Sequence, residues 1–555
     1  MPLFHRTPLW CALSLALLGL DVRAQALPDA GQVLESVEPR RPARPAPAAI
    51  DLDVPPPAPP TPAEQDHGPA IDVRRFAIEG NSAIATSDLQ ALLEPLEGQS
   101  LTLSQLEAGA ARITRLYRER GYPFAYAYLP EQTVAAGLVR ITVLEGRLGE
   151  VRVENLTRQR PHVIDAPLRR LQRGQVIRAD ALDSSLLLLG DISGVHSKAR
   201  LQPGSEVGTS DVVVMVEDAA LVSGTLDMDN YGNHYTGVWR ASGNLQLNGA
   251  MGLGERIKLH TLLSNEHLRN YRLDYQMPLG PWNTRVGAGV SHLNYELGKE
   301  FSVLGAYGSA AVASMHATQP LVRSRSANLN AHLQYDRKRL TDHIGLHNSH
   351  APKRSHLATL GLNGNWQDQW GSRSMNVWDL SWTRGQLRLG SDARQQDAQS
   401  TRSTGRFQTL NATFTRWQAL GGPLSLYGRV NGQWADKNLD SSEKMSLGGA
   451  HGVRAYPQGE ASGDMGWLAT LALRYAPAPG WQFSGFGDVG KVQLQRRPWH
   501  AGSNHRRLGG AGFGLQHDGQ DWSLETALAW RVGGRLASSA PERSPRLWLK
   551  AMRHF

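Results

Sequence analysis

A glycine-rich stretch late in the chain, GGAHGVRAYP, carries the residues best able to bind a charged group. It presents Arg454 and Tyr456 between segments that alternate apolar and polar residues, as β-strands do. Asp488 lies further along the chain, inside one of those alternating segments. A guanidinium and a carboxylate can form a bidentate ion pair, so the stretch could deliver Arg454 to Asp488 if it folds inward. The alternatives are an arginine on a solvated loop and an aspartate in a wet pore.

The segment around Asp488, GFGDVG at residues 485–490, also matches the glycine pattern of nucleotide-binding loops. Such loops need a strand that enters a helix whose N-terminus faces the phosphates. Here the alternation continues through KVQLQRR, and Val492 stands where a Walker loop requires Ser or Thr. We therefore expect a strand with Phe486, Asp488 and Gly490 on one face, and no bound nucleotide.

Patterns that indicate catalysis or metal binding are scarce. The sequence contains no H-E-x-x-H or G-x-S-x-G motif and no supported catalytic triad, so we expect neither an enzyme nor a cofactor. Four histidines fall in a stretch that we expect to form a long loop, namely His343, His347, His350 and His356. A metal site and a solvated polar loop are the two interpretations of this cluster, and we expect no metal.

The charge of the chain gives little reason to expect a nucleic-acid partner. Its 59 basic and 50 acidic residues are spread along the whole length. Nucleic-acid binding would need a clustered basic face or aromatic platforms, and neither is visible.

The N-terminus is typical of a cleaved secretory signal peptide over residues 1–24. His5 and Arg6 precede a short apolar run, and small residues follow up to Ala24. The single cysteine, Cys11, lies inside this segment, which excludes disulfides and cysteine-bound metal from the mature chain. No later stretch offers the roughly 18 consecutive apolar residues of a transmembrane helix.

Residues 25–39 predict a short amphipathic helix, with apolar residues at helical spacing and Asp29 as a possible cap. Prolines then recur from Pro39 to Pro62, and we assign residues 40–70 to a proline-rich linker. Such a segment favours an extended tether, on the order of 70 Å long. The small helix would therefore be attached by a long linker.

A small α+β unit is predicted for residues 71–146. It reads as the strand VRRFAIEG, two helical segments, and the strand pair FAYAYLPEQ and LVRITVLEG. The second helical segment begins with a capping box at Thr102 and Gln105. The same order of elements returns over residues 147–218, ending in the strand DVVVMVED. This favours a tandem repeat of one domain, with two unrelated α+β domains as the alternative.

From residue 219 to residue 555 the helical period disappears, and roughly sixteen alternating segments of about ten residues follow one another. Tight connections such as MGLGE and PLGPWN alternate with long ones such as GKEFSVLGAYGS and DHIGLHNSHAPKR. This pattern is typical of an outer-membrane β-barrel, because backbone polar groups in lipid need a closed sheet. A soluble β-rich domain is the alternative, but its apolar face would need a second sheet to cover it.

Further motifs make the chain recognisable, among them GYPFAYAYLPEQ, VLEGRLGEV, LLLLGDISGV, DNYGNHYTG and SSEKMSLGGAHGVRAYP. With the order of the segments, they resemble the two-partner secretion transporters of Gram-negative outer membranes, the TpsB type that exports filamentous haemagglutinins and haemolysins. The resemblance covers essentially the whole precursor. It implies an α+β tandem of two periplasmic POTRA (polypeptide-transport-associated) domains, at 71–146 and 147–218, before a sixteen-stranded antiparallel transmembrane β-barrel at 219–555.

In that family the sixth extracellular loop bends into the barrel with the motif V-R-G-Y at its tip, and a barrel strand carries F-x-D-x-G. The matching residues here are Val453, Arg454, Ala455 and Tyr456 in the loop and Phe486, Asp488 and Gly490 in the strand. The resemblance implies that residues of about 440–465 enter the lumen and that Arg454 clasps Asp488. Ala455 replaces the family's glycine, so a left-handed backbone at the tip would be strained.

The resemblance also implies a function, an outer-membrane pore that moves a large exoprotein from the periplasm to the cell surface, with the helix at 25–39 as a plug. The exoprotein's N-terminal secretion domain would bind the POTRA pair by strand addition or in an apolar groove. Candidate contacts are Tyr126, Tyr128, Leu129, Val212 and Val214. Other implied partners are outer-membrane lipids and, during biogenesis, the barrel-assembly machinery, and we expect a monomer. A BamA-like insertase and a passive porin or receptor are the alternatives.

Overall fold

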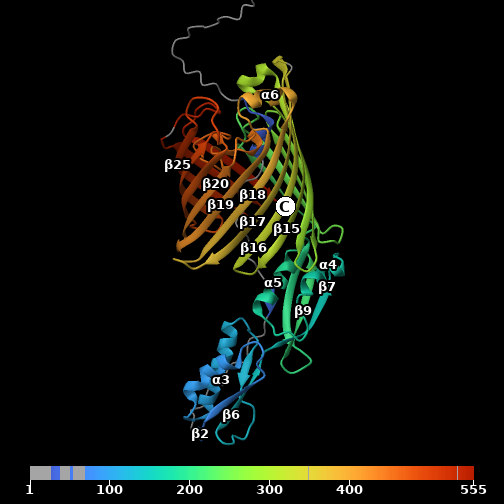
Figure 1. The fold of residues 1–555 in the computed structure, drawn as a ribbon, viewed down its shortest axis with the longest axis vertical. Helices are drawn as coiled ribbons and strands as arrows, with labels where there is room; N and C mark the ends of the chain where they lie inside the picture. The colour runs from blue at the N-terminus through green and yellow to red at the C-terminus, as the bar shows by residue number, and fades with distance from the viewer. Residues whose placement is uncertain (1–26, 38–50, 54–68, 348, 534) are drawn as a thin grey trace, which may run out of the picture.

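The computed structural model describes residues 27–37, 51–53, 69–347, 349–533 and 535–555. The expected signal peptide lies outside the described residues, as does most of the proline-rich linker. Figure 1 shows two small α+β units at one end of the long axis and a β-barrel at the other. Within the described residues, no helix is long and apolar enough to cross a membrane.

The first α+β unit packs two helices against a three-stranded sheet. Its elements are β2 (Ile71–Asp72), β3 (Arg75–Glu79), α2 (Thr86–Leu93), the 3-10 turn η1 (Glu94–Leu96), β4 (Ser100–Leu101), α3 (Leu103–Glu119), β5 (Tyr126–Tyr128) and β6 (Leu138–Leu144). The predicted capping box forms at the start of α3, between Thr102 and Gln105. In the sheet order β3-β6-β5, strand β5 lies at an edge.

The second unit repeats the order strand, helix, helix, strand, strand. Its elements are β7 (Arg147–Asn155), α4 (Pro161–Leu168), α5 (Ala179–Gly190), β8 (Val195–Pro203) and β9 (Thr209–Asp218). A short strand from the linker, β1 (Asp51–Asp53), pairs in parallel with β8. The sheet order is therefore β1-β8-β9-β7, and the linker covers the edge that β8 would otherwise expose.

Two arginines at the near end of the barrel hold the second unit. Arg323 forms a bidentate ion pair with Asp191, with both N–O distances 2.8 Å. Arg325 binds Asp183 in the same way, again at 2.8 Å for both contacts. These pairs identify the end of the barrel that faces the α+β units in Figure 1.

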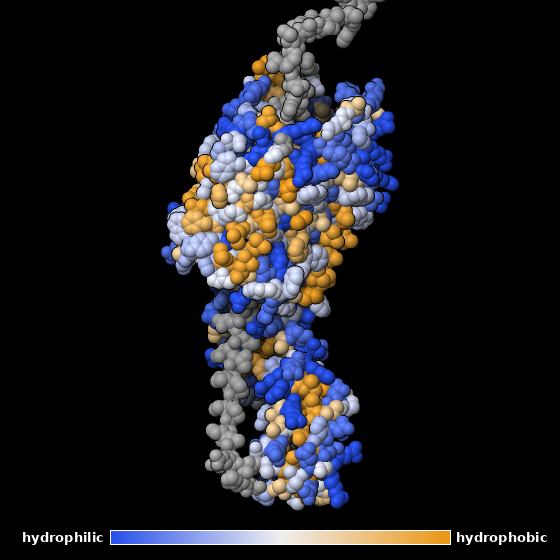
Figure 2. Space-filling view, turned by 90° about the vertical axis from the view of Figure 1, so that its left-hand side faces the viewer, coloured by the Kyte–Doolittle hydropathy of each residue, from blue (hydrophilic) through white to orange (hydrophobic). Residues whose placement is uncertain are grey.

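The predicted sixteen-stranded antiparallel barrel is confirmed, and it closes through the pairing of β10 with β27. Its strands are β10 (Val222–Asp229), β11 (Arg240–Asn248), β12 (Arg256–Ser264), β13 (Arg269–Leu279), β14 (Thr284–Glu296), β15 (Ala306–Arg323), β16 (Ala327–Ile344), β17 (Ser349–Asp368), β18 (Ser374–Leu389), β19 (Gly405–Gly421), β20 (Leu424–Ala435), β23 (Met465–Tyr475), β24 (Trp481–Gln493), β25 (His505–Asp518), β26 (Trp522–Arg531) and β27 (Arg546–His554). Figure 2 shows apolar residues gathered over the barrel wall, where lipid chains would contact it.

One connection was predicted wrongly. The stretch DHIGLHNSHAPKR is not a long loop, because β16 and β17 continue through it and place His343 directly opposite His350. These strands run for 18 and 20 residues, well beyond the expected length of about ten. The alternation of apolar and polar residues marks only the part of a strand that faces lipid. Beyond the lipid both faces are polar, although the hydrogen-bond ladder continues.

Candidate functional site

The segment between β20 and β23 lies inside the barrel. It contains the 3-10 turn η4 (Ser441–Glu443) and the short paired strands β21 (Met445–Ser446) and β22 (Ser462–Gly463). We call residues 436–464 the inserted loop. Its tip, with Val453 and Tyr456 almost fully buried, packs against the inner faces of β23 to β26.

Arg454 and Asp488 meet at this tip. The Nε atom of Arg454 donates to Oδ2 of Asp488 at 2.8 Å, and Nη2 donates to Oδ1 at 2.7 Å. The Asp488 side chain is fully buried in the middle of β24, and Thr470 on β23 donates a further hydrogen bond to it at 2.9 Å. Since the GFGDVG segment is a continuous strand, it offers no helix N-terminus for a phosphate.

Aromatic groups hold the arginine from two sides. The guanidinium carbon of Arg454 lies 3.2 Å from the centre of the Phe486 ring, a cation–π contact. The indole N–H of Trp548, on β27, donates to the carbonyl of Arg454 at 2.7 Å. The Tyr456 hydroxyl donates to the carbonyl of Arg535 at 3.0 Å. The tip is therefore attached to strand β27 through Trp548 and to the connection between β26 and β27 through Tyr456.

Two glycines of the wall make room for the loop. A Cβ at Gly490 would lie 2.8 Å from Cδ2 of Leu447, and a Cβ at Gly510 would lie 2.7 Å from Cβ of Ala455. The strain considered for Ala455 is absent, because its backbone is not among the left-handed residues. Its methyl group instead occupies the space that Gly510 leaves open, so alanine fits this tip.

Sequence reasoning missed the anchor of the returning leg of the inserted loop. Glu460 is fully buried and forms an ion pair with Arg506 on β25. It also accepts hydrogen bonds from the backbone N–H groups of Ser538 and Ser539, at 2.9 and 2.8 Å. A carboxylate among small residues just after the tip, in PQGEASG, was the available signal. Its partners lie on another strand and in the loop after β26, far away in the chain, where no periodicity points to them.

Helix α1 (Ala30–Val37) occupies the lumen beside the inserted loop. Its apolar residues Val33, Leu34 and Val37 are buried against inward-facing side chains of β14, β15 and β16. Asp29 caps the helix by accepting from the backbone N–H of Gln32 at 3.0 Å. The expected amphipathic helix with its cap is thus present, and its apolar face packs against the barrel wall.

Charged groups also hold this helix at its start. The Asp29 carboxylate binds Nζ of Lys353, on β17, at 2.7 Å and accepts from the Ser441 hydroxyl at 2.6 Å. The backbone N–H of Ala30 donates to Asp342, on β16, at 2.7 Å. Helix, loop and wall therefore meet at one polar cluster.

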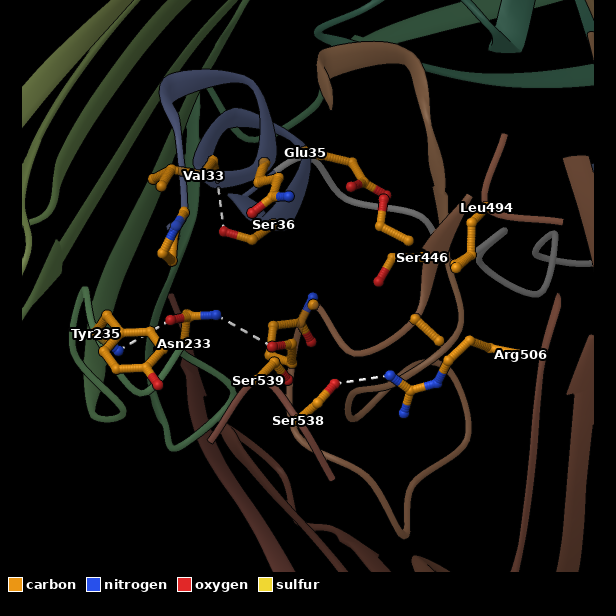
Figure 3. A pocket seen from close by; sticks show the side chains of 16 residues that line it. Val33, Glu35, Ser36, Asn233, Tyr235, Ser446, Leu494, Arg506, Ser538 and Ser539 are labelled. Carbon is orange, nitrogen blue, oxygen red and sulfur yellow. Dashed lines mark hydrogen bonds between the residues drawn. The ribbon is translucent and has the colours of Figure 1, made fainter. Parts of the chain in front are cut away.

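Little open space remains between helix α1 and the inserted loop. Figure 3 shows the cavity of about 210 Å³ that Ser36 and Tyr235 line on one side and Ser446 and Arg506 on the other. This is smaller than the roughly 300–1,000 Å³ of a pocket for a drug-sized ligand. Helix α1 and the inserted loop thus both occupy the lumen, with this cavity between them.

The candidate contacts on the α+β units separate into two groups. Tyr126 and Tyr128 lie on the edge strand β5 with stacked rings, 6.2 Å between centroids, and Leu129 follows them half-buried. Val212 and Val214 were assigned wrongly, because both side chains are fully buried in the core beneath β9. Strand β9 also has a partner on each side, so it offers no free edge.

His343, His350 and His356 lie on strands of the barrel wall, whereas His347 falls in the 3-10 turn η3 (Gly345–His347). His343 and His350 approach each other across β16 and β17, with nitrogen atoms 3.2 Å apart, and the Tyr335 hydroxyl lies 2.8 Å from Nδ1 of His356. Among the described residues, no group of three or more potential ligands could hold a metal ion.

Two family models match the chain. One, described as haemolysin secretion/activation protein ShlB/FhaC/HecB, matches residues 208–517, and the other, described as POTRA domain of ShlB type, matches residues 71–146. A similar curated protein is the heme/hemopexin transporter protein HuxB of Haemophilus influenzae (strain 86-028NP), 29% identical over 398 residues, which are 71% of this chain and 70% of that protein. The outer membrane transporter CdiB of Dickeya dadantii is 23% identical over 76% of this chain and 75% of its own.

Solved structures share the fold. CdiB from Escherichia coli superimposes with a TM-score of 0.71 at 19% identity, over 92% of this chain and 94% of that chain. BamA from Haemophilus ducreyi, lacking POTRA domains 1–3, reaches a TM-score of 0.52 at 14% identity, over 88% of this chain and 100% of that chain. Transporter and BamA folds both resemble this one, so the fold alone does not separate them.

The first family model covers more than half of the chain. The chain therefore belongs to the haemolysin secretion/activation family, the outer-membrane transporters of two-partner secretion.

Proposed function

We propose that this transporter exports one large exoprotein through its own lumen, in unfolded form and without a catalytic step. The observation that carries the proposal is the double obstruction of the lumen by helix α1 and the inserted loop. Helix α1 is attached by one apolar face and a polar cluster at its start, which permits it to move without unfolding the barrel. Folding of the exoprotein outside the cell would supply the direction of transport.

In this proposal the α+β units act as two POTRA domains, at 71–146 and 147–218, that capture the N-terminal secretion domain of the exoprotein. Strand addition needs an unpaired edge, and the linker strand β1 already covers the edge of β8. The edge strand β5, with Tyr126 and Tyr128, is the site we favour for the first contact.

Helix α1 then leaves toward the periplasm on its linker, while the inserted loop stays as a constriction. Val453, Arg454 and Tyr456 of the loop, with Phe486, Asp488 and Gly490 of the wall, would form the gate. Breaking a buried arginine–carboxylate pair by removing one partner costs about 3–5 kcal/mol. Such a loss would displace the loop tip and leave the sixteen-stranded wall closed. The transporter would act as a monomer that the barrel-assembly machinery inserts.

The test compares the culture medium of the native host with and without the transporter. One large polypeptide should disappear on deletion and return with the wild-type gene. Arg454→Ala and Asp488→Ala should assemble in the outer membrane but export little of it, while Asp379→Ala, which changes an aspartate on β18 away from the inserted loop, serves as a matched control. Wild-type export by both single variants would exclude the gate.

The same strains separate the alternatives. An insertase would show as a loss of other barrel proteins from the depleted outer membrane, whereas an exporter leaves their amounts unchanged. A passive porin would show steady conductance with helix α1 in place. The cavity of about 210 Å³ between that helix and the inserted loop favours a closed pore instead.

A further inference from the structure

Six arginines project from the outer face of four neighbouring barrel strands. They are Arg337 and Arg339 on β16, Arg354 on β17, Arg384 and Arg388 on β18, and Arg406 on β19, and all six are exposed. We call these residues the arginine patch. Strands β16 to β18 lie side by side in Figure 1, so the patch is one continuous surface.

Three members of the patch stand in a single row. Arg339 pairs in register with Arg354, and Arg354 pairs in register with Arg388. A second row, one side-chain repeat or about 7 Å further down the strands, places Arg337 opposite His356. Like charges directly opposite one another destabilise a sheet. The first row, in which three arginines are direct neighbours, therefore favours a bound anion that would offset this repulsion.

Within the described residues, no carboxylate forms an ion pair with any member of the arginine patch. Some other barrel arginines are paired, as Arg240 is with Asp229 and Arg416 with Asp368. The outer face of β16 to β19 thus collects positive charge that the protein itself does not neutralise.

The patch adjoins the apolar part of the wall. On the same outer face, Tyr335 lies next to Arg337 on β16, one side-chain repeat closer to the α+β units. Trp382 lies next to Arg384 on β18 in the same direction. Exposed leucines then continue toward the α+β units, namely Leu333, Leu360, Leu380 and Leu410. Aromatic residues mark the interfaces of a membrane barrel, so the arginines lie at the level of lipid head groups.

The leaflet follows from the direction of the strands. β16 begins at Ala327, next to Arg325, which holds the second α+β unit, and it reaches the patch only in its far half. The α+β units are periplasmic, as they are in the homologues. The arginine patch therefore faces the outer leaflet.

We propose that the arginine patch binds the phosphate groups of a phosphorylated glycolipid of the outer leaflet, of the lipid A class. Guanidinium groups form bidentate hydrogen bonds with phosphate. Two rows of them suit a head group that carries more than one phosphate. The acyl chains would lie along the leucines beneath, with Tyr335 and Trp382 at the boundary. This proposal concerns the lipid around the barrel and does not depend on the exoprotein.

The experiment uses the full-length transporter in detergent and adds bisphosphorylated lipid A, the same lipid with both phosphates removed, or inorganic phosphate at equal phosphate concentration. Binding is measured by native mass spectrometry and by the shift in melting temperature. The test variant is Arg339→Gln/Arg354→Gln/Arg388→Gln. Its matched control is Arg112→Gln/Arg115→Gln/Arg118→Gln, which removes the same charge from the exposed face of α3.

Each arginine near an anionic lipid surface strengthens binding by about fivefold, so the test variant should bind lipid A about a hundredfold more weakly. The control should bind as the wild type does. Without lipid, the test variant should melt at the wild-type temperature or above it, which shows that it folds. Equal binding of lipid A by wild type and test variant would overturn the proposal, as would equal binding of the dephosphorylated lipid. An equal shift in melting temperature with inorganic phosphate would show that free phosphate is sufficient as the ligand, which would overturn the assignment to the lipid.

Discussion

The ammonium group of Lys353, on β17, lies 2.7 Å from the carboxylate of Asp29 at the start of helix α1. The same ammonium lies 3.2 Å from Asp440 in the inserted loop and 3.7 Å from Asp342 on β16. One cation thus joins three carboxylates that belong to the plug, the loop and the wall. Removing it would leave buried negative charges without compensation, which is costly.

We predict that Lys353→Met releases helix α1 from the lumen. The carboxylates of Asp29, Asp342 and Asp440 would then repel one another without compensation. Of the three, only Asp29 lies on a segment that can leave the lumen, namely helix α1. Single-channel recordings in planar bilayers should show open events at least about tenfold more often than in the wild type, since about 1.4 kcal/mol corresponds to a factor of ten. Lys258→Met, which changes a lysine of β12, is the control and should leave this frequency unchanged. A variant that stays closed like the wild type would contradict a charged lock on the plug.

The contact between Ala455 and Gly510 supports a second prediction. Gly510→Ala would bring two methyl carbons to 2.7 Å, and overpacking of this kind costs about 1–3 kcal/mol. We expect export to fall in this variant and to recover in Gly510→Ala/Ala455→Gly, because the second change removes one methyl group. Gly487→Ala is the control, since a Cβ there has no neighbour within 4 Å. Export by Gly510→Ala at the wild-type level would show that the tip does not need this fit.

A third prediction concerns Glu145, at the end of the first α+β unit. Burial alone would raise the pKa of this carboxyl, but hydrogen bonds from the backbone N–H of Ala83 and from Ser82 and Tyr117 outweigh it and hold the pKa below its usual value. A depressed folded-state pKa stabilises the fold above the unfolded-state value of about 4.5, and this stability is lost as the pH falls through the folded pKa.

Glu145→Gln should therefore lower the free energy of unfolding of the α+β units by about 1–3 kcal/mol at pH 7. The difference from wild type should shrink as the pH falls below about 4.5. Urea unfolding monitored at pH 7 and pH 3.5 checks both statements. Glu79→Gln is the control, because its side chain is 56% exposed and its ion pair with Arg140 is on the surface. A difference that is the same at both pH values would exclude the carboxylate as its origin.

The sequence pattern predicted the barrel and the helix with its cap, whereas the meeting of Arg454 with Asp488 was implied only by the family motifs that the chain resembles. Each depends on a local period or on a motif whose members stand at set positions. Glu460 and Lys353 could not be found in this way, because their partners lie far away in the chain and sit in loops or on other strands. Only the folded structure brings such groups together.

The error at Val212 and Val214 has a different cause. A strand places alternate residues on opposite faces, but the run VVVMV is apolar in both phases. The pattern therefore could not tell which phase lies in the core. In the structure Val212, Val214 and Val216 are buried, and Met215 is exposed on the other face.

The last prediction concerns capture of the exoprotein at the edge strand β5. Tyr126→Ala/Tyr128→Ala removes the stacked ring pair while Ala127, the buried residue between them, remains. Each exposed aromatic ring can contribute about 0.5–1.5 kcal/mol to a contact beyond its buried area, so the affinity for the secretion domain should fall by about tenfold or more. Titration of the purified transporter with that domain measures the change, and circular dichroism checks that the fold is unaltered.

Val207→Ala, at a residue 91% exposed in the second unit, is the control and should bind as the wild type does. Unchanged affinity in the tyrosine variant would move the capture site away from β5, to another edge strand of the described sheets such as β3 or β7.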